Sequence, residues 1–431
     1  MNKEILKLAI PNILSNISIP LLSSVDTLLM GNLSAVHLGA VGIGSMIFNI
    51  IYWNFGFLRM GTTGMTAQAY GKGNKLAMTD TLLRAIVLAV IISALLLLCA
   101  IWIQKASFWS MNVQVNQFEF AKSYFYIRLF AAPATMSLFV IMGWFFGMQN
   151  AWFPLIVTII VNMANIAISY YCVVVLRLEV IGVAWGTVIA QYIGLTIAAV
   201  LLFWKYPFIV QHAAEVSLKK LATYKSFLVI NRDIFLRTTM LTFTFGFFHS
   251  KSSEMGEMVL AANLILLQFV NWMSYGIDGF AYAAESLVGK YKGAADDVKL
   301  KRVISHLLIW GAVLAICYSL IYAIFGDHII DLYTEDMDLI RFTERILYWA
   351  IWLPLLAFLS YIWDGIYIGL TASSSMRDTM FVAFALFLIS YLVCDYLELG
   401  NIGLWISLSV FLLFRGILQS ILYMKKGYEL K

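Results

Sequence analysis

Long apolar runs, separated by short polar breaks, extend over the whole chain. A helix that crosses roughly 30 Å of hydrocarbon needs about 20 apolar residues at about 1.5 Å per residue. Runs of that length occur twelve times, which predicts a polytopic all-α membrane protein. The predicted membrane-spanning helices cover residues 6–30, 38–69, 82–103, 124–147, 153–175, 181–204, 234–248, 259–287, 304–325, 346–370, 380–396 and 404–423.

The composition fits a membrane protein and excludes an ordinary soluble enzyme. Of the 431 residues, 62% are hydrophobic and 12% are charged, whereas about 25% of the residues of soluble domains are charged. So few charged residues cannot cover a soluble core of this size. The four cysteines lie far apart in apolar stretches, and the five histidines lack metal-ligand spacing. We therefore expect no enzyme activity, no cofactor and no metal site.

Positive charges are distributed unevenly between the two sides that twelve spans define. Of the 29 Lys and Arg residues, 19 fall on the side of the termini, six on the opposite side and four within or beside spans. Cytoplasmic loops of membrane proteins carry the excess of Lys and Arg. We therefore predict a multi-pass protein of the plasma (inner) membrane with both termini in the cytoplasm. The net charge of +5 then reflects orientation, and no nucleic-acid partner is expected.

One constant offset of 222 residues relates the two halves of the chain. The matched pairs are Leu38 with Leu260, Asn49 with Asn271, Gly71 with Gly293, Gly143 with Gly365, and Gly147 with Gly369. Six spans followed by six in the same order predict two pseudo-symmetric bundles related by an axis along the membrane normal. We assign residues 1–204 to the first bundle, 205–232 to a cytoplasmic linker with a surface helix, and 233–431 to the second bundle.

Asp26 lies well inside the first predicted helix, six residues after Pro20. An ionised side chain at the bilayer centre costs at least about 2.5 kcal/mol, which makes any such residue a functional candidate. Pro20 removes a backbone hydrogen bond and permits a bend. Because apolar surroundings favour the neutral carboxyl group, Asp26 is the predicted site of a coupling proton. The alternatives are an acid paired with a neighbouring arginine and an acid exposed at the mouth of the helix.

A polar stripe follows the eighth predicted helix. Its members recur at spacings of three and four residues and so share one helical face: Asn271, Tyr275, Asp278, Tyr282 and Glu285. A polar face of this length does not face lipid. It either lines a water-filled cavity, as a candidate substrate surface, or packs against polar partners in the bundle.

Asp364 lies among aromatic residues in the tenth predicted helix, with Tyr361 and Tyr367 three residues to either side. Such an acid either binds an organic cation together with the ring faces or is a buried acid with tyrosine hydroxyl partners. Arg59, in the second helix, is a candidate counter-ion for a buried acid. Its place toward the cytoplasmic end also permits its head group to reach the interface. Arg237 has the same two interpretations.

Several motifs together resemble the DinF-type branch of the multidrug and toxic compound extrusion (MATE) transporters. They are LRMGTTG at 58–64 with AQAYG at 67–71, NRDIFLRT at 231–238, DGFAYA at 278–283 and WDGIYIG at 363–369. The resemblance extends over nearly the whole chain. It implies two six-helix bundles that export organic compounds, driven by the entry of protons or sodium ions.

The resemblance also assigns residues in the first bundle. The family's first-helix aspartate falls on Asp26, and its bending proline falls on Pro11. Its cation cluster falls on Asn165 and Thr187, with an aspartate expected four residues after Asn165, where this chain has Ser169. Hard cations bind several oxygens, including charged ones. The loss of this carboxylate therefore favours a proton over sodium, while sodium in the second bundle stays open through Asp278 and Asp364.

We predict a secondary-active exporter that exchanges an external proton for an amphipathic, cationic organic solute by alternating access, with its bilayer and solute as partners and no second subunit. One alternative is a sodium-coupled exporter of the same fold. Another is a flippase for lipids or lipid-linked oligosaccharides, which would require a basic cavity for a pyrophosphate. The acids inside the spans outweigh the scattered arginines there and favour the exporter.

Overall fold

The computed structural model describes residues 1–31, 34–216 and 224–427, and the side chains of residues 19–33 lie outside the described part. Throughout the described residues the regular elements are helices, which confirms the predicted all-α class. Nine helical stretches there are long and apolar enough to cross a membrane, and a bent pair of helices supplies a tenth. The long helices α1 (Asn2–Gly31) and α11 (Tyr224–Glu254) correspond to the two other predicted spans.

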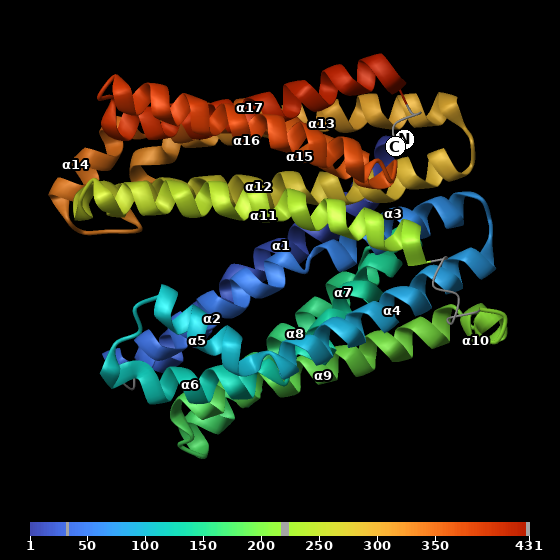
Figure 1. Cartoon of the computed structure of the whole chain (residues 1–431), viewed down its shortest axis with the longest axis horizontal. Helices are drawn as coiled ribbons and strands as arrows, with labels where there is room; N and C mark the ends of the chain where they lie inside the picture. The colour runs from blue at the N-terminus through green and yellow to red at the C-terminus, as the bar shows by residue number, and fades with distance from the viewer. Residues whose placement is uncertain (32–33, 217–223, 428–431) are drawn as a thin grey trace. The chain divides into compact units, whose positions relative to one another are not determined.

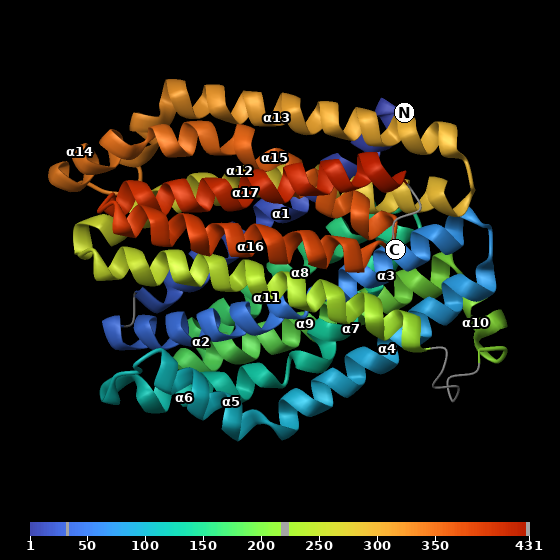
Figure 2. The ribbon, with the colours of Figure 1, turned by 45° about the horizontal axis from the view of Figure 1, so that its top comes forward.

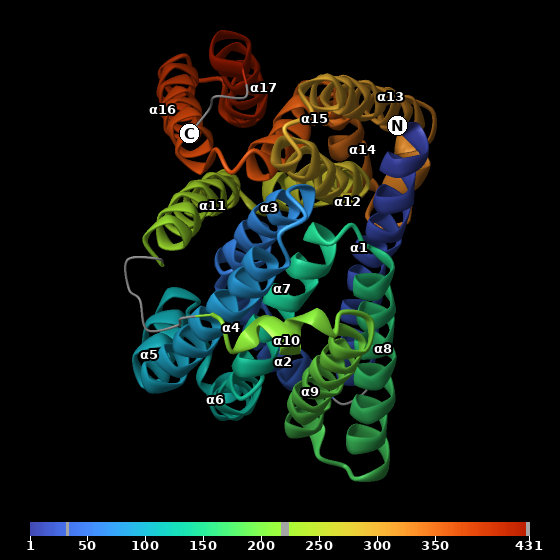
Figure 3. The same ribbon diagram turned by 90° about the vertical axis from the view of Figure 1, so that its right-hand side faces the viewer.

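Residues Leu14–Phe227 form one compact unit, here called the N-terminal unit. In it α8 packs along α9 and α3 packs along α7 (Figure 3). Besides most of α1, its helices are α2 (Ala35–Asn54), α3 (Phe57–Gly71), α4 (Lys75–Leu98), α5 (Ala100–Ser110), α6 (Val115–Leu129), α7 (Ala132–Gly147), α8 (Trp152–Tyr170), the π-helical turn η1 (Tyr171–Val175), α9 (Glu179–Lys205) and α10 (Phe208–Ala213).

Residues Met1–Ile13 and Leu228–Lys431 form the other compact unit, the C-terminal unit. In it α12 packs against α15, and α16 runs beside α17 (Figures 1 and 2). Besides α11, its helices are α12 (Glu257–Gly293), α13 (Asp297–Asp331), α14 (Met337–Ile346), α15 (Tyr348–Gly369), α16 (Ser373–Tyr396) and α17 (Gly400–Lys426).

The compact units differ from the predicted bundles at the start of the chain. The first 13 residues of the chain, Met1–Ile13, belong to the C-terminal unit, although the sequence assigned them to the first bundle. Glu4 shows this directly, because its carboxylate accepts a hydrogen bond of 2.8 Å from the Tyr291 hydroxyl. Of the predicted linker, α10 is a short helix, and residues 217–223 lie outside the described part.

The offset of 222 residues reappears in the helix boundaries. The run from the start of α2 to the end of α3 (Ala35–Gly71) and α12 (Glu257–Gly293) both contain 37 residues. Even the capping is repeated: the Asn74 side chain accepts from the Ala77 N–H at 2.9 Å, and the Asp296 side chain accepts from the Lys299 N–H at 3.0 Å. Such caps satisfy N–H groups that a helix start leaves unpaired.

Two spans of the N-terminal unit are interrupted near their middle. One break separates α2 from α3 at residues 55–56, and the other separates α6 from α7 with a bend of 49°. Pro133 accounts for the second, because it lacks an N–H and its ring clashes with the carbonyl group four residues earlier. Both breaks fall near the middle of their spans, residues 35–71 and 115–147. In the C-terminal unit, α12 continues unbroken through the position that corresponds to Gly56.

Candidate functional site

Three predicted polar residues of the N-terminal unit lie together between α8 and α9. The side-chain amide of Asn165 donates a hydrogen bond of 2.9 Å to the Thr187 hydroxyl, which donates one of 3.1 Å to the Val183 carbonyl. Ser169 follows one turn after Asn165 and packs so tightly on Gly186 that a side chain there would overlap the Ser169 hydroxyl. All three polar side chains are buried.

This cluster contains neutral acceptor groups that the described structure leaves unused. The Oδ1 atom of Asn165 and the Oγ atom of Ser169 are buried and have no hydrogen-bond partner there. Buried acceptors of this kind carry a desolvation cost of roughly 1–3 kcal/mol each until a donor or a cation meets them. The cluster is thus suited to a protonated partner or a weakly held cation.

The first helix runs beside the helix that carries this cluster. The Ser15 hydroxyl donates to the Thr158 hydroxyl at 3.1 Å, and the side-chain amide of Asn162 donates to the Ser18 hydroxyl at 3.0 Å. The side chains of Asp26 and Pro20 lie outside the described residues. Pro11 is buried in the part of α1 that belongs to the C-terminal unit. The roles predicted for Asp26, Pro11 and Pro20 therefore stay predictions.

The interior of the C-terminal unit holds a cluster of charged residues around Asp364. Arg237 of α11 forms an ion pair with the Asp364 carboxylate. Arg415 of α17 donates to it from Nη2 at 3.2 Å, and Gln419, one turn further, donates from Nε2 at 2.9 Å. None of these four residues is more than 7% exposed. Removing charges from water costs several kcal/mol per ion, so such a cluster persists only when its members satisfy one another.

The partners of Asp364 are guanidinium and amide groups, and not the tyrosine hydroxyls that the sequence suggested as one alternative. The hydroxyl of Tyr367 donates instead to the backbone carbonyl of Gln419 at 2.8 Å. The ring of Tyr361 lies under Arg415, whose guanidinium carbon is 5.5 Å from the ring centroid. A role of Asp364 in substrate binding stays a prediction, and any cation there would compete with two internal arginines.

The polar stripe on α12 passes from an exposed position into the interior of the C-terminal unit. Asn271 is exposed and donates to the Gln268 side chain at 3.4 Å, whereas Glu285 is 1% exposed. Tyr275, Asp278 and Tyr282 between them are half-buried. Asp278 and Glu285 both lie within electrostatic range of the Arg237 guanidinium. The stripe therefore supplies acids near the charged cluster at one end and an exposed amide, that of Asn271, at the other.

Arg59, the predicted counter-ion, is half-buried in α3. Its guanidinium carbon lies 5.9 Å from the centroid of the Phe146 ring. Its pairing with a buried acid stays a prediction. The charged cluster instead uses Arg237, for which the sequence left two interpretations, and Arg415, which the sequence left without a role. The position of Arg415 inside an apolar span was the available signal, because arginine inside a membrane helix normally has a buried partner.

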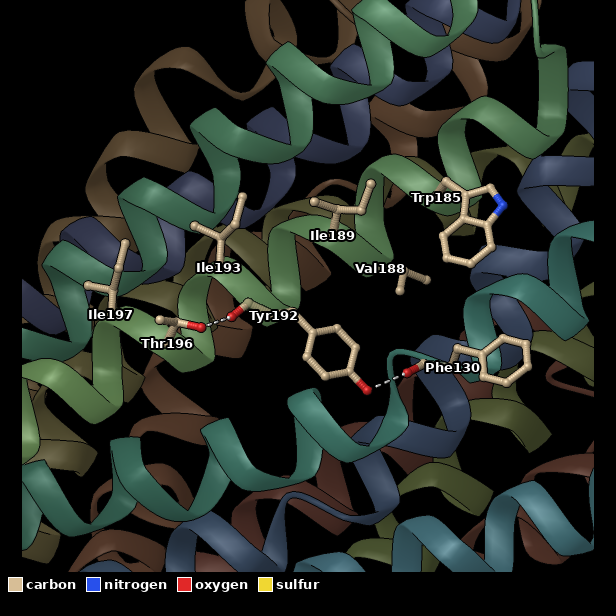
Figure 4. Close-up of a pocket in the computed structure, with 8 residues that line it drawn as sticks. All are labelled: Phe130, Trp185, Val188, Ile189, Tyr192, Ile193, Thr196 and Ile197. Carbon is tan, nitrogen blue, oxygen red and sulfur yellow. Dashed lines mark hydrogen bonds between the residues drawn. The ribbon is translucent and has the colours of Figure 1, made fainter.

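An apolar groove of about 590 Å³ follows one face of α9 in the N-terminal unit (Figure 4). Its lining includes Trp185, Ile189, Ile193 and Phe130. Tyr192 stretches across it and donates from its hydroxyl to the Phe130 carbonyl at 3.1 Å, where α6 ends and the break begins (Figure 4). The lining of this groove has no charged side chain. It is therefore suited to apolar contact and not to ion coupling.

Two homologous bundles of membrane-spanning helices with polar groups buried in their interiors define a secondary transporter. The family model MatE matches residues 11–171 and 234–397, once in each half. The chain therefore belongs to the MATE family of multidrug and toxic compound extrusion transporters. This confirms the resemblance inferred from the sequence motifs.

Individual relatives agree with this assignment. The chain is 35% identical over 419 residues to "DNA damage-inducible protein F" of Escherichia coli (strain K12), which covers 96% of this chain and 90% of that protein. It is 22% identical to "Probable multidrug resistance protein NorM" of Thermotoga maritima, over 100% and 93% of the two chains. A crystal structure described as "MATE in the bent conformation" superposes with a TM-score of 0.85 at 20% identity, covering 99% and 97%.

Proposed function

We propose that this transporter exports an amphipathic organic solute with cationic character in exchange for protons. It does so from the plasma (inner) membrane, with both termini in the cytoplasm. The observation that carries the proposal is the neutral buried cluster of Asn165, Ser169 and Thr187. A sodium site requires several oxygen ligands, including charged ones. This cluster offers neutral groups only, so Asp26 would be the single carboxylate, which suits a proton.

The C-terminal unit supports the same choice of ion. At Asp364 the positions that a cation would take are filled by the guanidinium groups of Arg237 and Arg415. A sodium ion would have to displace one of them and leave it buried without a partner, which is strongly unfavourable. Coupling therefore falls to the N-terminal unit. Asp278, the half-buried acid of α12, would attract a cationic group of the solute.

Coupling would work through the charge state of Asp26. Protonation removes a charge from apolar surroundings and lets α1 bend at Pro11 and Pro20, whose missing backbone hydrogen bonds weaken the helix there. A conformational equilibrium shifts only by the difference in proton affinity between its two states. A tenfold difference in that affinity corresponds to about 1.4 kcal/mol, enough to reverse the populations of two states of similar free energy.

The test is the transport activity of Asp26→Asn in inverted membrane vesicles with an imposed pH gradient. The variant is expected to bind a dye substrate but to accumulate none in response to the gradient, because its side chain does not titrate. Asp338→Asn, which removes an exposed acid of α14, is the matched control and should transport like the wild type. Full proton-driven accumulation by Asp26→Asn would overturn the proposal.

A further inference from the structure

Arg128 of α6 is a cation of the N-terminal unit that forms no ion pair with any acid whose side chain the structure describes. Its guanidinium carbon lies 5.5 Å from the centroid of the Phe48 ring and 5.7 Å from that of the Tyr52 ring. Its Nε and Nη1 atoms are buried, and neither finds a hydrogen-bond acceptor in the described structure. The residue as a whole is half-buried.

Two buried hydroxyl groups stand next to this guanidinium. Tyr52 of α2 lies within electrostatic range of Arg128, and its hydroxyl is a neighbour of the Thr135 hydroxyl at the start of α7. Both residues are more than nine-tenths buried, and their hydroxyls have no hydrogen-bond partner in the described structure other than each other. Two guanidinium donor atoms are therefore buried without acceptors beside a pair of hydroxyls that nothing else satisfies, which is rare in folded proteins.

The position along the spans is the one at which transporters hold their solutes. Arg128 and Thr135 flank the break between α6 and α7, and Tyr52 precedes the break between α2 and α3. Substrate sites of transporters lie near the middle of the bilayer, at discontinuous helices whose N-terminal ends point toward anionic groups. The N-terminal end of α7 adds its partial positive charge to that of Arg128.

A purely structural role does not account for the unpaired groups. The two aromatic rings attract the guanidinium charge but accept none of its in-plane N–H groups. Arg128 also sits in the last turn of α6, where a cation complements the helix end, yet its buried Nε and Nη1 atoms donate to no carbonyl group there. A planar acceptor with two oxygens satisfies such a donor arrangement.

We propose that Arg128, Tyr52 and Thr135 form a binding site for a carboxylate group of the exported solute. The inference rests on the proposed export of amphipathic cations and narrows it to solutes that also carry an acid, which makes them zwitterions. Arg128 would hold the carboxylate by charge-assisted hydrogen bonds, and the hydroxyls of Tyr52 and Thr135 would donate to its oxygens.

The test compares two dyes that differ at one group. Rhodamine 110 carries a carboxylate, and rhodamine 123 is its methyl ester. Binding of each to the purified full-length protein is measured by fluorescence anisotropy without any ion gradient. The wild type should prefer rhodamine 110. Arg128→Met should weaken rhodamine 110 binding by roughly tenfold or more, as expected for a lost charge-assisted hydrogen bond, and leave rhodamine 123 unchanged.

Further variants separate recognition from folding. Arg128→Lys should keep part of the preference for rhodamine 110, whereas Tyr52→Phe and Thr135→Val should each reduce it a few-fold. Arg341→Met, which removes the same charge from an exposed position of α14, should leave it intact. A wild type without the preference, or an Arg128→Met variant that keeps it, overturns the inference. Because no gradient is applied, neither result depends on whether protons drive transport.

Discussion

The two units share a backbone arrangement but not their buried charges. In the N-terminal unit Gly143 packs on the backbone of Arg59, and in the C-terminal unit Gly365 packs on the backbone of Ala281. Gly147 meets Thr63 and Thr66, and Gly369 meets Glu285 and Val288 at the corresponding positions. All of these contacts obey the offset of 222 residues. Close helix packing is thus the conserved part of the repeat, because small residues let helix backbones approach closely.

The charged cluster has no counterpart in the other unit. Arg237, Asp364, Arg415 and Gln419 correspond to Ser15, Met142, Ile193 and Ile197. Conversely, Arg128 corresponds to Ala350, a buried residue of α15. The C-terminal unit therefore neutralises Asp364 internally, while the described part of the N-terminal unit keeps neutral hydrogen-bonding groups and Arg128, which forms no ion pair there. In this comparison the Asp364 carboxylate is neutralised within its own unit, whereas the polar groups of the N-terminal unit are available to a coupling ion.

The largest expected effect comes from opening the charged cluster. Asp364→Asn removes the charge that pairs with Arg237 and Arg415 and leaves two buried guanidinium groups uncompensated. We expect a loss of about 3–5 kcal/mol in the free energy of unfolding, measured by equilibrium denaturation of the protein in detergent. Asp338→Asn provides the exposed control. A stability change below about 1 kcal/mol would show that the cluster is not closed on itself.

Because the two units share their close helix contacts, corresponding glycine substitutions should destabilise both units equally. Gly143→Ala and Gly365→Ala each place a methyl group against a helix backbone, which cannot move aside as a side chain would. Each substitution should lower the free energy of unfolding by about 1–3 kcal/mol, and the two decreases should be similar. Gly42→Ala, where no neighbouring atom lies within 4 Å, should not destabilise, because alanine favours the helix over glycine. A large effect in only one unit would contradict the equivalence of the packing.

The smallest effect should come from the neutral hydrogen bond of the N-terminal unit. Thr187→Val removes the hydroxyl that accepts from Asn165. Hydrogen bonds between membrane helices average about 0.6 kcal/mol, so a loss of roughly that size is expected in the same denaturation assay. At the corresponding place in the C-terminal unit, Ser409 has a buried hydroxyl without a partner in the described structure. Ser409→Ala should therefore leave the free energy of unfolding unchanged. A decrease in that free energy would contradict the difference inferred between Thr187 and Ser409.

The sequence predicted the spans, the repeat and the family, because hydrophobic length and the glycine positions are local features of the chain. It did not predict how Asp364 is paired, since Arg237, Asp364 and Arg415 are separated by 127 and 51 residues and nothing local indicates which charges meet. The break between α6 and α7 was likewise hidden inside one continuous apolar run. Pro133 was visible there, but whether a proline bends or breaks a membrane helix depends on the packing around it.

Accumulation of a rhodamine dye in inverted vesicles tests the central claim most directly, with a pH gradient and a sodium gradient imposed separately on the wild-type protein. The account predicts that the pH gradient alone drives accumulation, that sodium alone drives none, and that Asp26→Asn abolishes the response. Accumulation driven by sodium alone would contradict it, because it would require a cation site that neither the neutral cluster of the N-terminal unit nor the paired Asp364 provides.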